Sequence, residues 1–283
     1  MARRKKERSG PKLTRAAKPA TFEVEAYNER AEMVPTAIAG EHPLTLYLDK
    51  RELVTLMTLG HAPEALAIGY LRNQRLVGSV EDIAAVQVDW ETESVAVTTT
   101  KKKDIREKIK RKTVTTGCGQ GTVFGDLMEE IDQVKLRDDV LLSDENLFVL
   151  IERVRKHETI YKQAGAVHGC ALATLAGEIL MFVEDVGRHN AVDAIAGFMW
   201  LDGIDGSDKV FYTTGRLTSE MVIKCAQMRI PFLVSRSGLT KMGHEIARKV
   251  GLTMIGRASG RHYLAFTGRQ RLKRSAPQPT MTA

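Results

Sequence analysis

The 283-residue chain is 43% hydrophobic and 27% charged, so it can bury a substantial core, as one large or two modest domains, without disulfide bonds. No run of about eighteen uncharged apolar residues is present, which argues against a membrane span. Three widely spaced cysteines, and a basic N-terminus with no apolar stretch behind it, predict a cytoplasmic protein without an export signal.

The net charge of +7 is concentrated at the N-terminus. Residues 1–18 contain eight basic side chains and one acidic side chain, whereas the rest of the chain has 34 of each. Such a stretch predicts a solvated, disordered tail, with weak binding of nucleic acid or of an acidic partner as the alternative. The neutral body makes a nucleic-acid-binding protein the less favoured class.

Residues 19–142 predict a smaller α+β region. Alternation of apolar and polar residues predicts strands at 21–27 and 44–50 and a hairpin over 84–100. Between them, residues 51–77 predict a strand followed by a helix that begins near the sequence His-Ala-Pro. The basic run 101–112 predicts either a solvated or mobile loop or a contact with a partner or anion.

Residues 143–272 predict a regular α/β core. Ser143 caps a helix whose buried face consists of Leu147, Leu150, Ile151 and Val154. Strands and helices then alternate, with strands at 168–175, 178–187, 209–215, 231–235, 252–256 and 262–268 and helices at 190–200, 217–228 and 240–250. This order predicts a mixed, mostly parallel sheet covered by helices, and residues 273–283 predict a frayed tail.

Four loops are expected at the edge formed by the carboxyl ends of these strands, where ligands usually bind. They are "EDVGRHN", "TTGRLTSE", "SRSGLTKMG" and "GRASGR", each with glycine and at least one arginine. The arginines Arg188, Arg216, Arg236, Arg257 and Arg261, together with helix N-termini, predict a site for a phosphate-bearing ligand. The alternative is that glycine and arginine only form soluble turns.

Cys118 is the strongest candidate nucleophile. It lies in "TTGCGQG", where Gly117, Gly119 and Gly121 leave the sulfur sterically open. A thiol reacts as the thiolate, which an exposed position near positive charge favours, although a small side chain in a glycine turn is an equally simple interpretation. Cys170 and Cys225 lie in apolar patterns and are expected to be core residues.

Other constellations are weaker. The chain has no Cys-x-x-Cys pair, and His168 and Cys170 are only two positions apart, so a zinc site is not expected. A nucleophilic system of Cys118, His189 and Asp185 can be drawn, but spacing along the chain gives no distances. The polar residues of "EDVGRHN" are expected to belong to a site, with helix capping by Asp185 or Asn190 as the alternative.

Four segments together resemble the formate dehydrogenase accessory sulfurtransferases: "HAPEALAIGYL", "GCGQG", "VEDVGRHNAVD" and "YTTGRLTSEMVIKCAQMRIPFLVSRS". The resemblance implies a protein that takes sulfur from a cysteine desulfurase as a cysteine persulfide. It implies transfer of that sulfur to the molybdenum of a bis(molybdopterin guanine dinucleotide) cofactor, bound as substrate and destined for formate dehydrogenase. It also implies a homodimer with a cytidine-deaminase-like core that has no zinc site, and the deaminase sequence signature is indeed absent.

The resemblance also assigns residues. Cys118 matches the persulfide cysteine, and the C-terminal cofactor-binding segment is matched by Phe266, Thr267, Gly268, Arg269, Gln270 and Arg271. Family members commonly have a Cys-Gly-x-Cys pair, and here the second position is Gly121, so transfer would use one thiol. The missing thiol keeps a second class open, a molybdenum-cofactor-binding chaperone that does not transfer sulfur.

Overall fold

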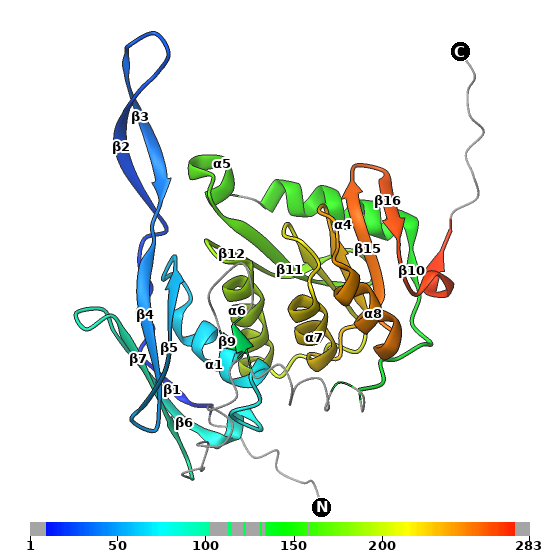
Figure 1. Ribbon diagram of the computed structural model, residues 1–283, viewed down its shortest axis with the longest axis horizontal. Helices are drawn as coiled ribbons and strands as arrows, with labels where there is room; N and C mark the ends of the chain where they lie inside the picture. Colours follow the sequence, from blue (N-terminus) through cyan, green and yellow to red (C-terminus); the bar gives the residue numbers. More distant parts are fainter. Residues whose placement is uncertain are drawn as a thin grey trace, which may run out of the picture.

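Two β-sheets joined by packed helices form the protein (Figure 1). The computed structural model describes residues 10–101, 113–114, 121–122, 131, 134–157 and 159–274. The first sheet and helix α1 belong to the N-terminal part of the chain, and the second sheet with α4 to α8 belongs to the C-terminal part.

The N-terminal sheet has the strand order β1-β6-β7-β4-β5. Its strands are β1 (Lys12–Leu13), β4 (His42–Leu48), β5 (Arg51–Thr58), β6 (Ile83–Asp89) and β7 (Ser94–Thr99). Helix α1 (Pro63–Asn73) has proline in its first turn, and a short 3-10 helix (Val80–Asp82) precedes β6. The predicted strands, helix and hairpin of this region are confirmed.

A separate two-stranded arm, β2 (Thr21–Tyr27) and β3 (Met33–Ala39), projects away from this sheet (Figure 1). The two strands pair antiparallel along their whole length, from Thr21 opposite Ala39 to Tyr27 opposite Met33. An isolated hairpin is only marginally stable, so its exposed face is a candidate contact surface.

The predicted disordered tail is too long. Strand β1 pairs in parallel with β6, the Ala16 N–H donates to Glu64 Oε1 at 2.9 Å, and the Trp90 indole N–H donates to the Ala16 carbonyl at 2.5 Å. Residues 10–18 are therefore part of the folded N-terminal region, because backbone pairing and an aromatic anchor offset their high charge. Residues 1–9 lie outside the described part of the chain.

The central sheet has the strand order β12-β11-β13-β14-β15-β16. Its strands are β11 (His168–Thr174), β12 (Ile179–Asp185), β13 (Lys209–Thr213), β14 (Phe232–Ser235), β15 (Thr253–Ser259) and β16 (His262–Ala265). Only the pairings β13 with β14 and β14 with β15 are parallel, and the other three are antiparallel. The sheet is thus mixed as predicted, but its hydrogen-bonded pairs are not mostly parallel, because β11 runs antiparallel to both β12 and β13 and β16 folds back on β15.

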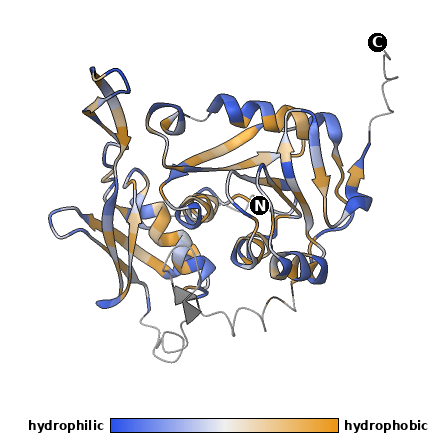
Figure 2. Cartoon of the chain, turned by 45° about the horizontal axis from the view of Figure 1, so that its top comes forward, coloured by the Kyte–Doolittle hydropathy of each residue, from blue (hydrophilic) through white to orange (hydrophobic). Residues whose placement is uncertain are grey.

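Helices cover both faces of the central sheet. Helix α4 (Asp144–His157) packs on one face together with the β17 (Leu272–Lys273) and β10 (Leu142–Ser143) ladder, while α6 (Arg188–Leu201), α7 (Ser219–Gln227) and α8 (Lys241–Val250) cover the other. Ser143 Oγ accepts the Asn146 N–H at 3.2 Å, and the four apolar residues predicted for α4 are all buried. Figure 2 shows the outer side of α4 as hydrophilic and the inner side as hydrophobic. Lys273, predicted to begin the C-terminal tail, is paired in β17.

The two halves of the chain are joined by a very close crossing of α1 and α6. A Cβ atom on Gly69 would lie 1.6 Å from the Asp193 carbonyl oxygen, and one on Gly197 would lie 1.9 Å from the Ala65 carbonyl oxygen. Only glycine permits this approach of two backbones. One continuous apolar core consequently spans both sheets, and no helix in the described residues is long and apolar enough to cross a membrane.

Candidate functional site

Cys118 lies outside the described residues, so its surroundings stay a prediction. The strands on either side of it, β8 (Thr113–Val114) and β9 (Gly121–Thr122), pair antiparallel. Gly121, which the resemblance matches to the second position of a Cys-Gly-x-Cys pair, lies in β9 opposite Val114. The basic run 102–112 is also outside the described part.

The carboxyl ends of β12, β13 and β14 lie on the same edge of the central sheet, and an arginine follows each of them. Burial lowers the pKa of His168 first, and the positive charges of Arg188, Arg236 and Arg216 lower it further. The three arginines therefore lie in one region around His168, and their binding of a ligand stays a prediction. The sequence pattern did not place His168 beside these arginines, because its position at the start of β11, antiparallel to β12 and β13, depends on strand pairing.

Arg188 is the unusual member of this arginine cluster. It is only 5% exposed, yet its Nε has no hydrogen-bond partner and it forms no ion pair with any residue the structure describes. Its side chain lies over Gly215, where a Cβ atom would come within 2.6 Å of the Arg188 Cδ. A buried guanidinium without a counter-charge is costly, so this position suits an anionic ligand.

Helix N-termini add positive potential to the same edge. Helix α6 begins at Arg188, α7 at Ser219 and α8 at Lys241. Thr240 caps α8 by accepting the Gly243 N–H at 3.2 Å, whereas the Thr218 hydroxyl at the start of α7 is buried and makes no hydrogen bond. The start of α7 thus has no side-chain cap, and its Thr218 hydroxyl is unpaired among the described residues.

Arg216 and Arg236 are exposed and mark the opening of this region. The Arg236 guanidinium lies 5.1 Å from the centre of the Tyr161 ring, which belongs to the short helix α5 (Ile160–Ala164). A cavity of about 460 Å³ adjoins Arg236, between α4 and the end of β15, and is lined by Phe148 and Tyr212 among others. An aromatic wall beside arginines is able to hold a planar base next to its phosphates.

Glu184 and Asp185, the acidic residues of "EDVGRHN", have structural roles. Glu184 accepts hydrogen bonds from the N–H groups of Thr159, Ile160 and Tyr161, which caps α5. Asp185 accepts the Thr58 hydroxyl at 2.6 Å and the Leu59 N–H at 3.2 Å, and so links the central sheet to β5. These carboxylates hold the site together and are not free to act on a ligand.

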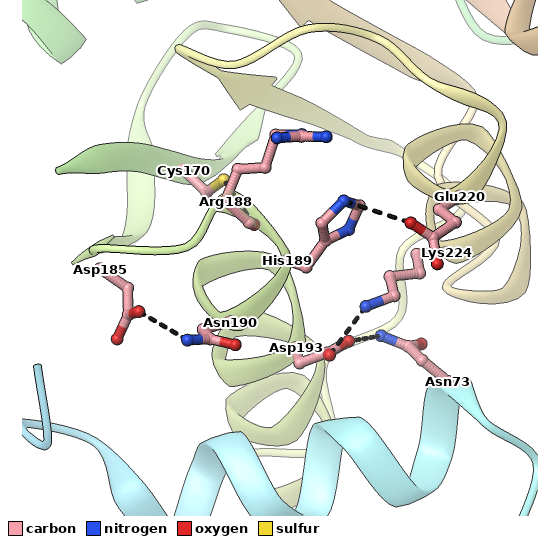
Figure 3. Close-up of polar contacts among 9 residues, drawn as sticks. All are labelled: Asn73, Cys170, Asp185, Arg188, His189, Asn190, Asp193, Glu220 and Lys224. Atoms are coloured by element: carbon pink, nitrogen blue, oxygen red, sulfur yellow. Dashed lines mark hydrogen bonds and ion pairs between the residues drawn. The ribbon is translucent and has the colours of Figure 1, made fainter. Parts of the chain in front are cut away.

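Asn190 completes this link. Its amide donates to Asp185 Oδ1 at 2.8 Å (Figure 3). It also donates to the Met57 carbonyl at 2.6 Å. The alternative predicted from the sequence was that Asp185 or Asn190 caps the following helix. The N-cap residue of α6, Gly187, receives no side-chain cap; instead Asp185 accepts the Gly187 N–H at 3.1 Å, and both side chains link the start of α6 to β5.

His189 is not part of a Cys-His-Asp system with Asp185. Its Nε2 lies 3.3 Å from Glu220 Oε2, and burial together with Lys224 and Arg188 lowers its pKa to about 2 (Figure 3). The imidazole is thus neutral at physiological pH. One turn further along α6, Asp193 pairs with Lys224 at 2.8 Å and accepts the Asn73 amide at 2.7 Å, which ties α6 to α7 and α1.

The C-terminal segment 266–271 is not next to Arg188. Thr267 Oγ1 bonds the Leu252 carbonyl and the Met254 N–H, and Arg271 donates to the Gly251 carbonyl, all near the amino end of β15. Arg269 and Gln270 are exposed beside a separate cavity of about 330 Å³.

Phe266 is closest to the arginine loops. Its ring and the Ser237 carbonyl both lie within 3.2 Å of the place that a Gly256 Cβ would take. The structure therefore separates the predicted cofactor-binding residues into two places, the carboxyl edge and the amino end of β15.

No group of three or more His, Cys, Asp or Glu side chains suited to a metal ion occurs among the described residues. The predicted absence of zinc and the predicted likeness to cytidine deaminases remain predictions. Cys170 and Cys225 are fully buried, as expected for core residues.

The fold defines a mixed α/β protein whose arginine-lined edge is a candidate site for an anion. The FdhD/NarQ family model matches residues 39–273, so the chain belongs to this family. It is 31% identical over 228 residues to the "Sulfur carrier protein FdhD" of Wolinella succinogenes, covering 80% of this chain and 79% of the relative.

A second sulfur carrier protein FdhD, from Sulfurisphaera tokodaii, is 28% identical over 250 residues, which cover 87% of this chain and 95% of the relative. A crystal structure from Desulfotalea psychrophila, described as a formate dehydrogenase accessory protein, matches with a TM-score of 0.73 and 24% identity. That match covers 90% of this chain and 100% of the other. At that identity the structural match supports the fold alone.

Proposed function

We propose that this protein is a cytoplasmic sulfurtransferase that carries sulfur on Cys118 for the maturation of formate dehydrogenase. It receives the sulfur from a cysteine desulfurase and delivers it to the molybdenum of a bis(molybdopterin guanine dinucleotide) cofactor. The family membership of residues 39–273, with relatives named as sulfur carriers, is the observation that carries this proposal.

Both transfers can be written with one thiol. The Cys118 thiolate attacks the terminal sulfur of the donor persulfide, the donor S–S bond breaks, and the donor cysteine leaves as a thiolate. In the second step the terminal sulfur bonds to molybdenum and Cys118 leaves as a thiolate. The two electrons that convert this sulfur into a sulfido ligand come from the reduced molybdenum, so no second cysteine is needed at Gly121.

The arginine edge, which is the carboxyl edge of the central sheet with Arg188, Arg216 and Arg236, supports the proposal that the protein binds the cofactor. The cofactor is a polyanion with two guanine nucleotide ends. Arg188, Arg216 and Arg236 would hold its phosphate groups, and the cavity lined by Phe148 beside Arg236 has space for a base. Because the cofactor has two ends, the separate segment 266–271 would provide a second contact.

Persulfide formation is directly measurable. After incubation with a cysteine desulfurase and cysteine, the peptide that contains Cys118 is expected to gain the mass of one sulfur atom, removable by a thiol reductant. Intact-protein and peptide mass spectrometry check this, with peptides containing Cys170 and Cys225 as internal controls. An unmodified Cys118 peptide under conditions in which the desulfurase itself is loaded would contradict sulfur transfer.

The alternative function is a cofactor-binding chaperone without sulfur chemistry, and the arginine edge together with Gly121 favours it. The double change Arg216→Gln and Arg236→Gln is expected to weaken guanosine diphosphate binding about tenfold or more, because charge-assisted hydrogen bonds are lost. Isothermal titration calorimetry measures this, and Arg30→Gln, far out on the arm, is the control. Unchanged affinity in the double variant would place the nucleotide elsewhere, and the same titration of Arg269→Gln would then test the second segment.

The homodimer expected from the resemblance would use the β2–β3 arm. Phe22 and Ile38 lie opposite each other on one face of the arm, 44% and 47% exposed, and Val24 continues this face. Glu23 and Glu25 in β2 and Pro35 in β3 disfavour pairing along the strand edges. Contact through the apolar face of a second copy is therefore the simplest way to cover the arm.

The arm makes dimerisation testable. The double change Phe22→Glu and Ile38→Glu is expected to convert a dimer into a monomer, since it places like charges in an apolar interface. Analytical ultracentrifugation measures this. Tyr27→Glu with Met33→Glu, on the opposite face of the same arm, is the matched control and should leave the mass unchanged. A monomeric wild-type protein would refute the proposed dimer.

A further inference from the structure

A second basic site lies at the other end of the helices, away from the arginine edge. A groove of about 1120 Å³ is formed where α1, α6 and α7 end, and residues 77–81 and 134–137 complete its walls. The arginine edge adjoins the first turns of α6 and α7, whereas this groove adjoins their last turns, so the two sites are distinct.

Positive charges crowd this groove. The Arg72 guanidinium lies 5.2 Å from the centre of the Trp200 indole and donates to the Ala196 carbonyl at 2.7 Å. Burial, and after it the charges of Arg75 and Arg229, lowers the pKa of Arg72 to about 10. The groove therefore holds cations that repel one another.

Positive side chains outnumber negative ones in this groove. Its lining includes five cations, Arg72, Arg75, Lys135, Arg137 and Arg229, and two carboxylates, Glu81 and Asp205. Of the cations, Arg72, Lys135 and Arg229 form no ion pair within 4.0 Å with a carboxylate of any residue the structure describes. The hydrogen bond from Ser207, and further the charge of Arg229, lower the pKa of the Asp205 carboxyl. A negatively charged ligand would relieve the repulsion.

Gln227 indicates which anion fits. It lines the groove, and both its Nε2 and its Oε1 are buried without a hydrogen-bond partner. A phosphate group offers acceptors, which satisfy Nε2 and leave Oε1 unpaired. A peptide backbone offers a carbonyl oxygen and an N–H together, so it satisfies both atoms of the amide.

We propose that this groove binds an acidic peptide segment of a partner protein. Arg229 and Lys135 contact its carboxylates, Gln227 pairs with its backbone, and the indole of Trp200 provides an apolar floor. Nucleic acid is the less suitable ligand, because residues 19–283 carry equal numbers of basic and acidic side chains.

Fluorescence anisotropy with the full-length protein tests this site. The probe is a short fluorescein-labelled peptide of alternating glutamate and glycine, and its control has glutamine in place of glutamate. The glutamate peptide is expected to bind about tenfold more tightly or better at low salt. Arg229→Glu with Lys135→Glu should remove this preference, whereas Arg30→Glu with Lys50→Glu, the same change in net charge elsewhere, should keep it.

Gln227→Leu separates peptide recognition from charge alone. It leaves the net charge unchanged and is expected to weaken the glutamate peptide several-fold, because the backbone pairing is lost. Equal binding of both peptides, or equal losses in both charge-reversal variants, would overturn the proposal. Displacement of the peptide by guanosine diphosphate or by a single-stranded oligonucleotide would also overturn it, and neither result would bear on sulfur transfer by Cys118.

Discussion

Replacing Cys118 with alanine is expected to lower formate dehydrogenase maturation at least about a hundredfold, because the proposed nucleophile is removed. No other cysteine can take over its role. Cys170 and Cys225 are fully buried, and burial raises the pKa of both thiols, that of Cys170 to about 12. A buried neutral thiol neither reaches a donor persulfide nor attacks it.

Formate oxidation in cells that depend on this protein for maturation measures the effect of Cys118→Ala. Cys225→Ala is the matched control, and it should retain activity as far as the protein remains folded. Guanosine diphosphate binding by purified Cys118→Ala should equal that of the wild type, which shows that the variant is intact. Full maturation by Cys118→Ala would leave the chaperone function as the better account.

The regular elements of the fold were predictable because their burial patterns are simple. Helix α4 illustrates this, since its four spaced apolar residues and Ser143 gave both its face and its start. The pairing partners of strands were not predictable, because strand order depends on contacts between residues far apart in sequence. Residues 10–18 were misjudged for the same reason, since Glu64 and Trp90 hold them in place.

The arginine edge was predictable in outline. Loops after parallel strands share an edge, so Arg216 and Arg236 were assigned from order alone. The burial of each arginine could not be predicted from strand order. Arg188 is the arginine that packs against Gly215 and whose buried Nε has no hydrogen-bond partner. The sequence "EDVGRHN" does not show whether its polar residues contact a ligand or link elements of the fold. In the structure, Asp185 and Asn190 link β5 to the central sheet.

Both proposed ligand sites contain buried polar atoms that have no hydrogen-bond partner among the described residues. They are Arg188 Nε and the Thr218 hydroxyl at the carboxyl edge, and the Gln227 amide at the far groove. Buried polar groups are normally paired, as Asp193 is with Lys224 and with the Asn73 amide. Unpaired buried atoms also occur at His42, His61, Asn73, His189 and Arg271, so such atoms support a site only together with the positive charge around it.

Gly69→Ala is expected to destabilise the protein by about 3 kcal/mol or more, the upper end of overpacking effects. In most helices this change stabilises by up to about 1 kcal/mol, because alanine has less backbone freedom to lose. Here the new Cβ would lie 1.6 Å from the Asp193 carbonyl oxygen, so α1 and α6 must move apart. That movement also strains the Asn73 to Asp193 bond at 2.7 Å.

Urea unfolding followed by circular dichroism measures the loss of stability. Gly197→Ala should lose as much stability as Gly69→Ala, because its Cβ would lie 1.9 Å from the Ala65 carbonyl oxygen on the other side of the same crossing. Gly238→Ala is the control, since a Cβ there meets no atom within 4 Å, and its free energy of unfolding should change by less than about 0.5 kcal/mol. If Gly69→Ala were as stable as Gly238→Ala, the close crossing could not be what joins the two sheets. A loss of stability in Gly69→Ala and Gly197→Ala but not in Gly238→Ala would instead mean that α1 and α6 must remain in backbone contact. The arginine edge would then depend on this contact, because it is assembled from β12, α6 and α7 and is tied to β5 through Asp185.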